Sequence, residues 1–101
     1  MHYVICYDIT NDRLRERVGK DLERNGCLRL QKSVFIAPDL KRPHLDRLRA
    51  ALRKRLERRP MDEGDSIYFI PLPNEAAMAT EGIPNNSAYA SLFAKPRKII
   101  L

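Results

Sequence analysis

An apolar run near the start of the chain, residues 2–10, ends on a single carboxylate, Asp8. Apolar or aromatic side chains occupy both sets of alternating positions in this run, and the side chains of a strand point to opposite faces in turn. A strand that is apolar on both faces needs cover on both, so the pattern predicts a buried central strand. Asp8 shares the face of Val4 and Cys6. Its charge would have to be satisfied by backbone donors, an arginine or a metal ion.

A four-residue apolar period follows and predicts a helix. Residues 10–12 are all good N-cap residues, so the helix begins within this tripeptide. The predicted buried stripe consists of Leu14, Val18 and Leu22. The helix ends at residues 25–26, where Gly26 can adopt the left-handed cap conformation.

Residues 28–37 form an extended segment whose alternation breaks at residues 32–33, which predicts two short strands joined by a tight reversal. Pro43 fits the first turn of a second helix, and Pro60 ends it. The predicted apolar side of this helix consists of Leu45, Leu48, Leu52 and Leu56.

The apolar run at residues 66–72 predicts another strand, and its prolines place that strand at a sheet edge. Residues 74–95 are irregular, with a short helix expected near residues 75–79. Residues 96–101 are typical of a terminal strand. We therefore divide the chain into a core, residues 1–73, and a segment, residues 74–101, that carries the connection and a C-terminal strand docking on a dimer partner.

The order of these elements is the βαββαβ plan of an α+β, ferredoxin-like sandwich with an appended C-terminal strand. Such a sheet carries helices on one face only. The first and fourth strands are nevertheless apolar on both faces. The uncovered face must meet another surface, and we expect a two-fold homodimer packed sheet to sheet.

Charge adds a second expectation. The 101 residues suit one domain, and the net charge of +6 favours a polyanion such as nucleic acid. Residues 41–59 carry a net +7, and the rest of the chain carries −1. Arg47, Lys54 and Arg58 point away from the leucine stripe at helical spacing. They form either a solvated face or a nucleic-acid contact, and the sequence leaves both readings open.

Cys6 and Cys27 form no zinc or redox motif, so both are expected to be reduced packing residues in a cytoplasmic protein. The chain begins with strand-like sequence, and we expect no signal peptide. No apolar run approaches the roughly 20 residues of a membrane span.

Three local patterns now coincide. Tyr7-Asp8-Ile9-Thr10 ends the first strand, arginines open the first helix, and Leu-Arg-Leu-Gln-Lys-Ser-Val-Phe occupies residues 28–35. The arginines are Arg13, Arg15 and Arg17. Over residues 1–72 the order and spacing of these patterns resemble CRISPR-associated protein two, the small subunit of the spacer-acquisition machinery.

The resemblance implies a dimeric ferredoxin-like protein whose last strand joins the partner's sheet. It implies spacer integration together with the integrase, CRISPR-associated protein one, and metal-dependent endonuclease activity on single-stranded RNA or double-stranded DNA. The family's metal-binding acid matches Asp8, and its aromatic residues match Tyr7 and Phe35. Its basic residues match Arg15, Arg17 and Arg29.

One Asp8 per chain is a poor site for Mg²⁺, which usually takes one or two carboxylates and several waters. Two copies across a two-fold could share one ion, which would activate a water. Arg15, Arg17 and Arg29 would then bind phosphate oxygens. Alternatively, Asp8 caps the following turn, and the arginines form a solvated face. Tyr7 and Phe35 are likewise either core or interface residues or stacking partners for bases, whereas His2 and His44 are expected to be incidental.

Two principal hypotheses follow. The first is a dimeric scaffold that binds duplex DNA through its phosphates and bridges the integrase. The second is a Mg²⁺-dependent nuclease that acts through paired Asp8; a toxin-like ribonuclease on single-stranded RNA is a weaker variant. Beside the catalytic candidates, the expected nucleic-acid contacts are Tyr7, Arg13, Phe35, Arg47, Lys54 and Arg58.

Overall fold

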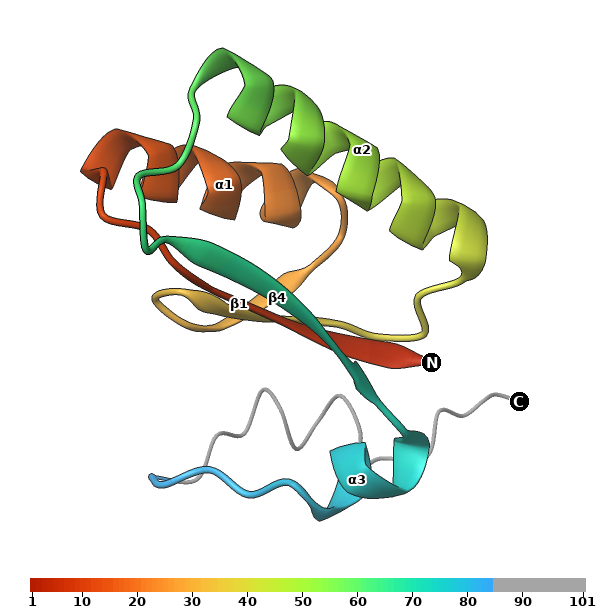
Figure 1. Cartoon of the computed structure of the whole chain (residues 1–101). Helices are drawn as coiled ribbons and strands as arrows, with labels where there is room; N and C mark the ends of the chain where they lie inside the picture. Colours follow the sequence, from red (N-terminus) through yellow and green to blue (C-terminus); the bar gives the residue numbers. More distant parts are fainter. Residues whose placement is uncertain (85–101) are drawn as a thin grey trace.

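Four antiparallel strands in the order β2-β3-β1-β4 form the sheet of the computed structural model, which describes residues 1–84. Helices α1 and α2 run side by side across one face of this sheet (Figure 1). The elements are β1 (His2–Asp8), α1 (Asp12–Arg24), β2 (Leu28–Gln31), β3 (Val34–Ala37), α2 (Arg42–Arg58), β4 (Ser66–Leu72) and α3 (Asn74–Ala79). This is the predicted ferredoxin-like arrangement. The predicted terminal strand at residues 96–101 lies outside the described residues.

β1 is the central strand that its sequence predicts, because it pairs with both β3 and β4. Its residues Ile5 and Tyr7 are buried in the core under the helices. Val4 lies opposite Ile70, and Cys6 lies opposite Tyr68, on the other face of the sheet. β4 is an edge strand, as its prolines predict. Asp8 thus stands at the end of the central strand, on the face away from α1 and α2.

The predicted boundaries of α1 are confirmed by its caps. Asn11 is the N-cap, and its Oδ1 accepts a hydrogen bond from the Leu14 N–H at 2.9 Å. Beyond the last turn, Gly26 has a φ of +85°, which a glycine adopts without steric cost. The α1 stripe is fully buried, so packing reinforces the local signals.

Asp21 joins α1 to α2. Its carboxylate is buried and accepts two hydrogen bonds from Arg55 Nε and Nη2, at 2.9 and 3.0 Å. These hydrogen bonds hold the pKa of Arg55 above its ordinary value. Because a bidentate pair fixes both separation and orientation, it sets how the two helices lie against each other.

The predicted reversal at residues 32–33 is confirmed as the turn between β2 and β3. The Tyr7 N–H of β1 donates to the Ser33 carbonyl at 3.1 Å, which ties this turn to the central strand. The pairing shifts register between Arg29 and Gln31. The turn therefore lies beside the end of β1 that carries Asp8.

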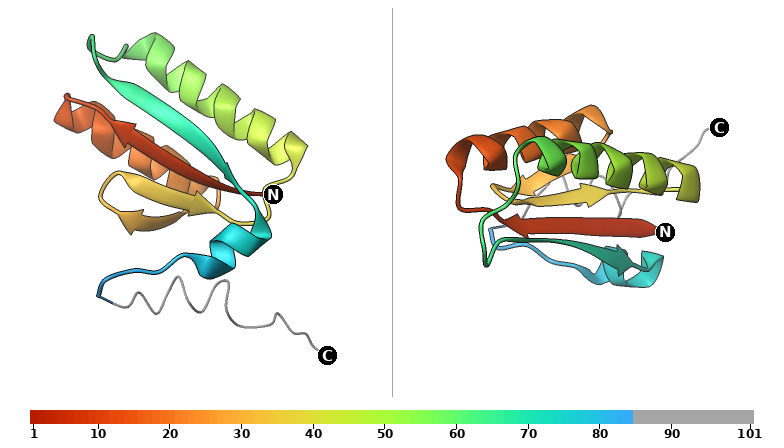
Figure 2. Two further views of the ribbon diagram at one scale, coloured as in Figure 1. Left: turned by 60° about the horizontal axis from the view of Figure 1, so that its bottom comes forward. Right: turned by 45° about the horizontal axis from the view of Figure 1, so that its top comes forward.

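The face of the sheet away from α1 and α2 is only partly covered in residues 1–84. The short helix α3, predicted from residues 75–79, lies on this side (Figures 1 and 2), so helices are not confined to one face. Three large apolar side chains on this face are exposed: Leu28 by 46%, Tyr68 by 62% and Ile70 by 45%. We call these three residues the open apolar face.

His2 has a structural role that the sequence analysis missed. Its Nδ1 accepts a hydrogen bond from the Asp39 N–H at 3.0 Å, and its Nε2 lies 2.9 Å from Asn74 Oδ1. Since Nδ1 is the acceptor, Nε2 carries the proton and donates it to the amide oxygen. His2 thus ties the start of β1 to α3 and to the loop before α2.

Candidate nucleic-acid interface

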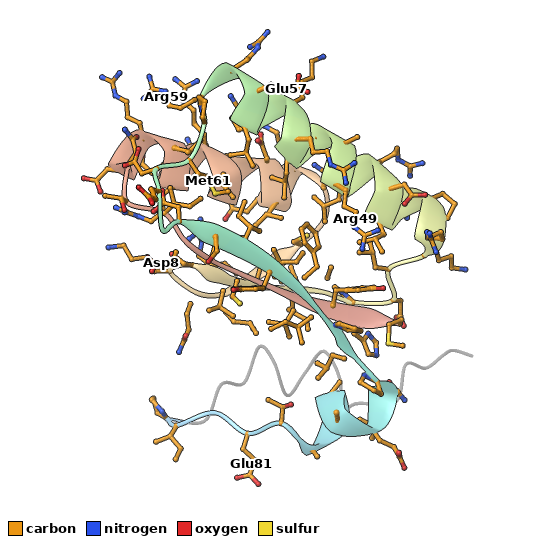
Figure 3. The ribbon with its side chains drawn as sticks, viewed as in Figure 1. Asp8, Arg49, Glu57, Arg59, Met61 and Glu81 are labelled. Carbon is orange, nitrogen blue, oxygen red and sulfur yellow. The ribbon has the colours of Figure 1, made fainter. Side chains whose placement is uncertain are left out.

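Asp8 is exposed at the end of β1, opposite Ser66 of β4 (Figure 3). Within residues 1–84 its carboxylate accepts no hydrogen bond and forms no ion pair. The alternative in which Asp8 caps the following turn is therefore not realised among the described residues. The Leu14 N–H donates to Asn11, and the Thr10 N–H donates to Asp65. Because Asp8 is exposed, its charge requires no buried donor.

The loop after Asp8 is held by Asp65. One carboxylate oxygen of Asp65 accepts from the Thr10 N–H at 3.1 Å and the Thr10 hydroxyl at 2.8 Å, and the other accepts from the Asp62 N–H at 3.0 Å. Desolvation raises the pKa of Asp65, but these hydrogen bonds outweigh it and leave the pKa below its ordinary value. The ionised Asp65 therefore fixes the backbone between Asp8 and α1.

Two overlapping groups of basic residues lie near this loop, and Lys20 belongs to both. The first lines a concave surface of about 450 Å³ that we call the Arg29 pocket. The Arg29 pocket is lined by Arg15, Lys20, Arg29 and Lys32, together with Asp12, Glu16 and Glu23. The second group lines a groove of about 540 Å³ over α1 and α2. That groove is lined by Arg13, Glu16, Arg17, Lys20, Arg24 and Arg55.

This division separates two arginines that the sequence analysis placed in one site. Arg15 belongs to the Arg29 pocket, and Arg17 belongs to the groove over α1 and α2. Residues two apart on a helix do not share a face, which explains the separation. A single phosphate group cannot therefore be assigned to both arginines.

Arg15 is held in place near the N-terminus of α1. Its Nη1 donates to the Ile9 carbonyl at 3.1 Å, and its Nη2 donates to the carboxylate of Asp12. Ile9 directly follows Asp8 in the chain. The structure thus places a half-buried guanidinium beside the backbone that carries the exposed carboxylate.

Arg29 is fixed by three contacts. Its Nη1 donates to the Lys32 carbonyl at 2.6 Å, and its Nε lies 3.5 Å from a carboxylate oxygen of Glu23. Its Cζ lies 4.7 Å from the centroid of the Phe35 ring, in a cation–π contact. The planar guanidinium is consequently presented to the pocket in one orientation, which favours hydrogen bonding to phosphate oxygens.

Tyr7 and Phe35 lie in the core beneath this pocket. Their side chains are 6% and 0% exposed, and their rings stack with centroids 6.1 Å apart. In the described structure neither ring offers a face to a nucleic-acid base, so both support the pocket from below. Burial raises the pKa of Tyr7, and the charges of Arg29 and Arg15 offset part of that shift. The phenol therefore stays protonated at neutral pH.

The predicted contacts on α2 are exposed but contribute to neither concave surface. Arg47, Lys54 and Arg58 are solvent-facing, as their helical spacing predicts. Their binding to nucleic acid stays a prediction. The pocket instead includes Lys20 and Lys32, which the sequence analysis did not select because nothing in their spacing shows that β2 folds back beside α1.

The described residues hold no group of three or more histidine, cysteine or carboxylate side chains that could bind a metal ion. Asp8 supplies a single exposed carboxylate, so the other ligands of a Mg²⁺ ion would have to be waters, substrate phosphates or a carboxylate from a second chain. Across residues 1–84, no helix has both the length and the apolar character needed to cross a membrane.

The fold and the pocket define a class of protein: a small ferredoxin-like domain with a strand-end carboxylate near a pocket that is lined by four basic and three acidic side chains. A family model described as "CRISPR associated protein Cas2" matches residues 1–79, and the chain belongs to that family.

Two relatives illustrate the similarity. A Pyrobaculum aerophilum protein named "CRISPR-associated endoribonuclease Cas2 2" is 38% identical over 52 residues, which cover 48% of this chain and 57% of the relative. The chain thus matches little more than half the length of that protein. A chain from a solved "Partial Cas6-RT-Cas1--Cas2 complex" has a TM-score of 0.74 at 24% identity, and the match covers 99% of this chain and 98% of that chain. This second likeness shows the shared fold.

Proposed function

We propose that the protein acts in CRISPR adaptation as a cytoplasmic homodimer, which binds duplex DNA through its phosphates and bridges subunits of the Cas1 integrase. Family membership and the shared fold support this role. The observation that carries the DNA contact is the Arg29 pocket, where Arg15 and Arg29 are each anchored by backbone carbonyls. Such anchoring lowers the entropy lost when a side chain engages a phosphate.

The proposal is tested by the salt dependence of duplex binding. Four basic side chains line the pocket of each protomer beside three carboxylates, and if all four bind phosphate each contact contributes about −0.9 to the slope of log affinity against log salt. The affinity should therefore fall roughly 100-fold between about 50 and 200 mM salt. Fluorescence anisotropy with a labelled duplex of mixed sequence measures this slope. Affinity that stays constant over this range would contradict phosphate binding.

The open apolar face supports the dimer. It presents Leu28, Tyr68 and Ile70 on the side of the sheet opposite α1 and α2. Exposed apolar side chains that share one sheet face favour association, and a two-fold axis would set this face against a second copy of itself. Because Asp8 lies on this face of the sheet, its carboxylate and that of the second copy would both be on the side of the interface.

The labelling rate of the Cys6 thiol tests for this dimer. It is half-buried on the same sheet face as Tyr68, whereas burial raises the pKa of Cys27 to about 11. A thiol reagent at pH 8 should therefore label one cysteine quickly in dilute protein, because Cys27 stays a buried thiol. Labelling of Cys6 should slow as the protein concentration rises. A labelling rate that is independent of concentration, with a monomeric mass in sedimentation, would rule out the sheet-to-sheet dimer.

A Mg²⁺-dependent nuclease is the second candidate, and one observation favours it. Asp8 is a solvent-exposed carboxylate without a partner among the described residues, one position from the carbonyl that anchors Arg15. A pair of such acids across a two-fold axis would be the ligands for one shared Mg²⁺, which supplies a water activated for attack on phosphorus. The RNA-directed activity in the name of the Pyrobaculum relative makes single-stranded RNA a substrate to assay beside duplex DNA.

Replacing Asp8 with asparagine tests the nuclease. If paired Asp8 binds the metal, cleavage of both nucleic acids should fall by at least about 100-fold, with thermal stability unchanged because Asp8 is exposed. Asp62→Asn is a matched control, since it removes one exposed carboxylate from the neighbouring loop. Cleavage that survives Asp8→Asn would assign the activity to another site.

A further inference from the structure

Gly19 occupies an unusual position for a glycine, since it lies in the interior of α1 and is buried. A glycine there costs helix stability relative to alanine. Its φ is not in the left-handed region, so backbone conformation does not require it. The reason must therefore lie in what packs against it.

A Cβ atom on Gly19 would lie 2.8 Å from Arg29 Nη2 and 3.1 Å from the Tyr7 hydroxyl oxygen. The first distance is shorter than side-chain carbons tolerate, and the second is tight. It would also lie 3.6 Å from Phe35, which is ordinary contact. The missing side chain thus leaves a slot on α1 that holds the guanidinium and the phenol.

The Tyr7 hydroxyl reinforces this interpretation. It is buried and has no hydrogen-bond partner within residues 1–84, although the Arg29 guanidinium is its close neighbour. The slot therefore brings the phenol and Nη2 of Arg29 together against α1. The other two guanidinium nitrogens are directed to Lys32 and Glu23. Nη2 is the nitrogen that lies in the slot, against α1.

We propose that Gly19 is a positioning residue for phosphate binding: its slot seats Nη2 of Arg29 against α1 and holds the guanidinium over Phe35, so that the edge of Arg29 that lines the Arg29 pocket is oriented toward an anionic phosphate oxygen. This inference rests on the proposed nucleic-acid binding and identifies the geometry that it needs. The ligand is the phosphodiester backbone of a nucleic acid, and Gly19 acts on it only through Arg29.

The test is Gly19→Ala, with stability, duplex binding and the NMR signals of Arg29 as readouts. Alanine favours the helix, and the displaced group is the far end of a flexible side chain, so the protein should fold with equal or higher stability in urea. Duplex affinity should nevertheless fall about fivefold at 50 mM salt, and the salt slope should become shallower by about one phosphate contact. The ring-current shift of the Arg29 side-chain protons over Phe35, measured by NMR, should also shrink.

An Arg29→Lys background distinguishes a positioning role of Gly19 from a general loss of structure in the Gly19→Ala variant. A lysine ammonium is a compact charge on a flexible stem and has no planar fork to fit in the slot. Gly19→Ala should therefore weaken binding when position 29 is arginine and have no effect in the Arg29→Lys background. Equal losses in both backgrounds would overturn the proposal. So would wild-type affinity and an unchanged ring-current shift in Gly19→Ala.

Failure of the proposed function would look different. If Arg29→Gln bound the duplex as tightly as wild type, with the same salt slope, the pocket itself would not bind phosphate. That result would overturn the nucleic-acid role of Arg29 and with it the role of Gly19. If Arg29→Gln weakens binding and Gly19→Ala does not, only the positioning role of Gly19 is overturned.

Discussion

Replacing Arg15 and Arg29 together with glutamine is expected to weaken duplex DNA binding roughly 30-fold at about 50 mM salt. The estimate takes about 1 kcal/mol for each lost phosphate contact, and 1.4 kcal/mol corresponds to a tenfold change. The salt slope should become shallower by about two, because two fewer counterions are released. Anisotropy titrations at several salt concentrations measure both quantities. Each arginine also donates to a backbone carbonyl and Arg29 lies over Phe35, so the double variant should lose about 1–3 kcal/mol of stability and is titrated well below its unfolding transition.

A charge-matched control distinguishes phosphate binding in the Arg29 pocket from the non-specific attraction of the duplex to basic side chains elsewhere on the protein. Arg47→Gln with Arg58→Gln removes the same charge from the exposed side of α2, where these residues contribute to neither concave surface. If the pocket binds phosphate, this control should weaken binding by less than about fivefold. Equal losses in the two double variants would contradict a defined site. A larger loss in the α2 variant would instead support the contact that the charge of residues 41–59 predicts.

The fold could be predicted from the sequence because its signals are local and agree with one another. Asn11 caps α1 where the apolar period begins, and Gly26 follows its last turn. The broken alternation at residues 32–33 marks the reversal between β2 and β3. The position of β1 in the sheet then follows from its apolar side chains on both faces, which predict a central strand with a neighbour on each edge.

The site was harder to predict, because it depends on contacts between elements. Arg15 and Arg29 meet only because β2 folds back beside α1, whereas Arg17 points to the other side of the same helix. The aromatic residues Tyr7 and Phe35 have the composition of stacking residues but lie in the core. Gly19 carried a signal, a glycine inside a helical pattern, but its reason is visible only in three dimensions.

Replacing Phe35 with alanine is expected to lower the free energy of unfolding by about 4 kcal/mol. Phe35 is fully buried, stacks on Tyr7 and supports the Arg29 guanidinium. A domain of this size has roughly 5–15 kcal/mol in total, so the variant should lose a large part of its stability. Urea unfolding followed by far-ultraviolet circular dichroism measures the change. The melting temperature should fall by roughly 20 °C.

Two further variants separate core packing from ligand contact. Tyr68→Ala removes an aromatic ring that is 62% exposed on the open apolar face, so in dilute protein it should change stability by less than about 0.5 kcal/mol. Phe35→Leu keeps an apolar side chain and should cost about 1.5 kcal/mol, but it removes the aromatic face under Arg29. Duplex affinity should therefore fall in Phe35→Leu while the fold persists. If Phe35→Ala kept wild-type stability and still lost binding, Phe35 would contact the nucleic acid directly, because only a ring outside the core can be removed without an energetic cost.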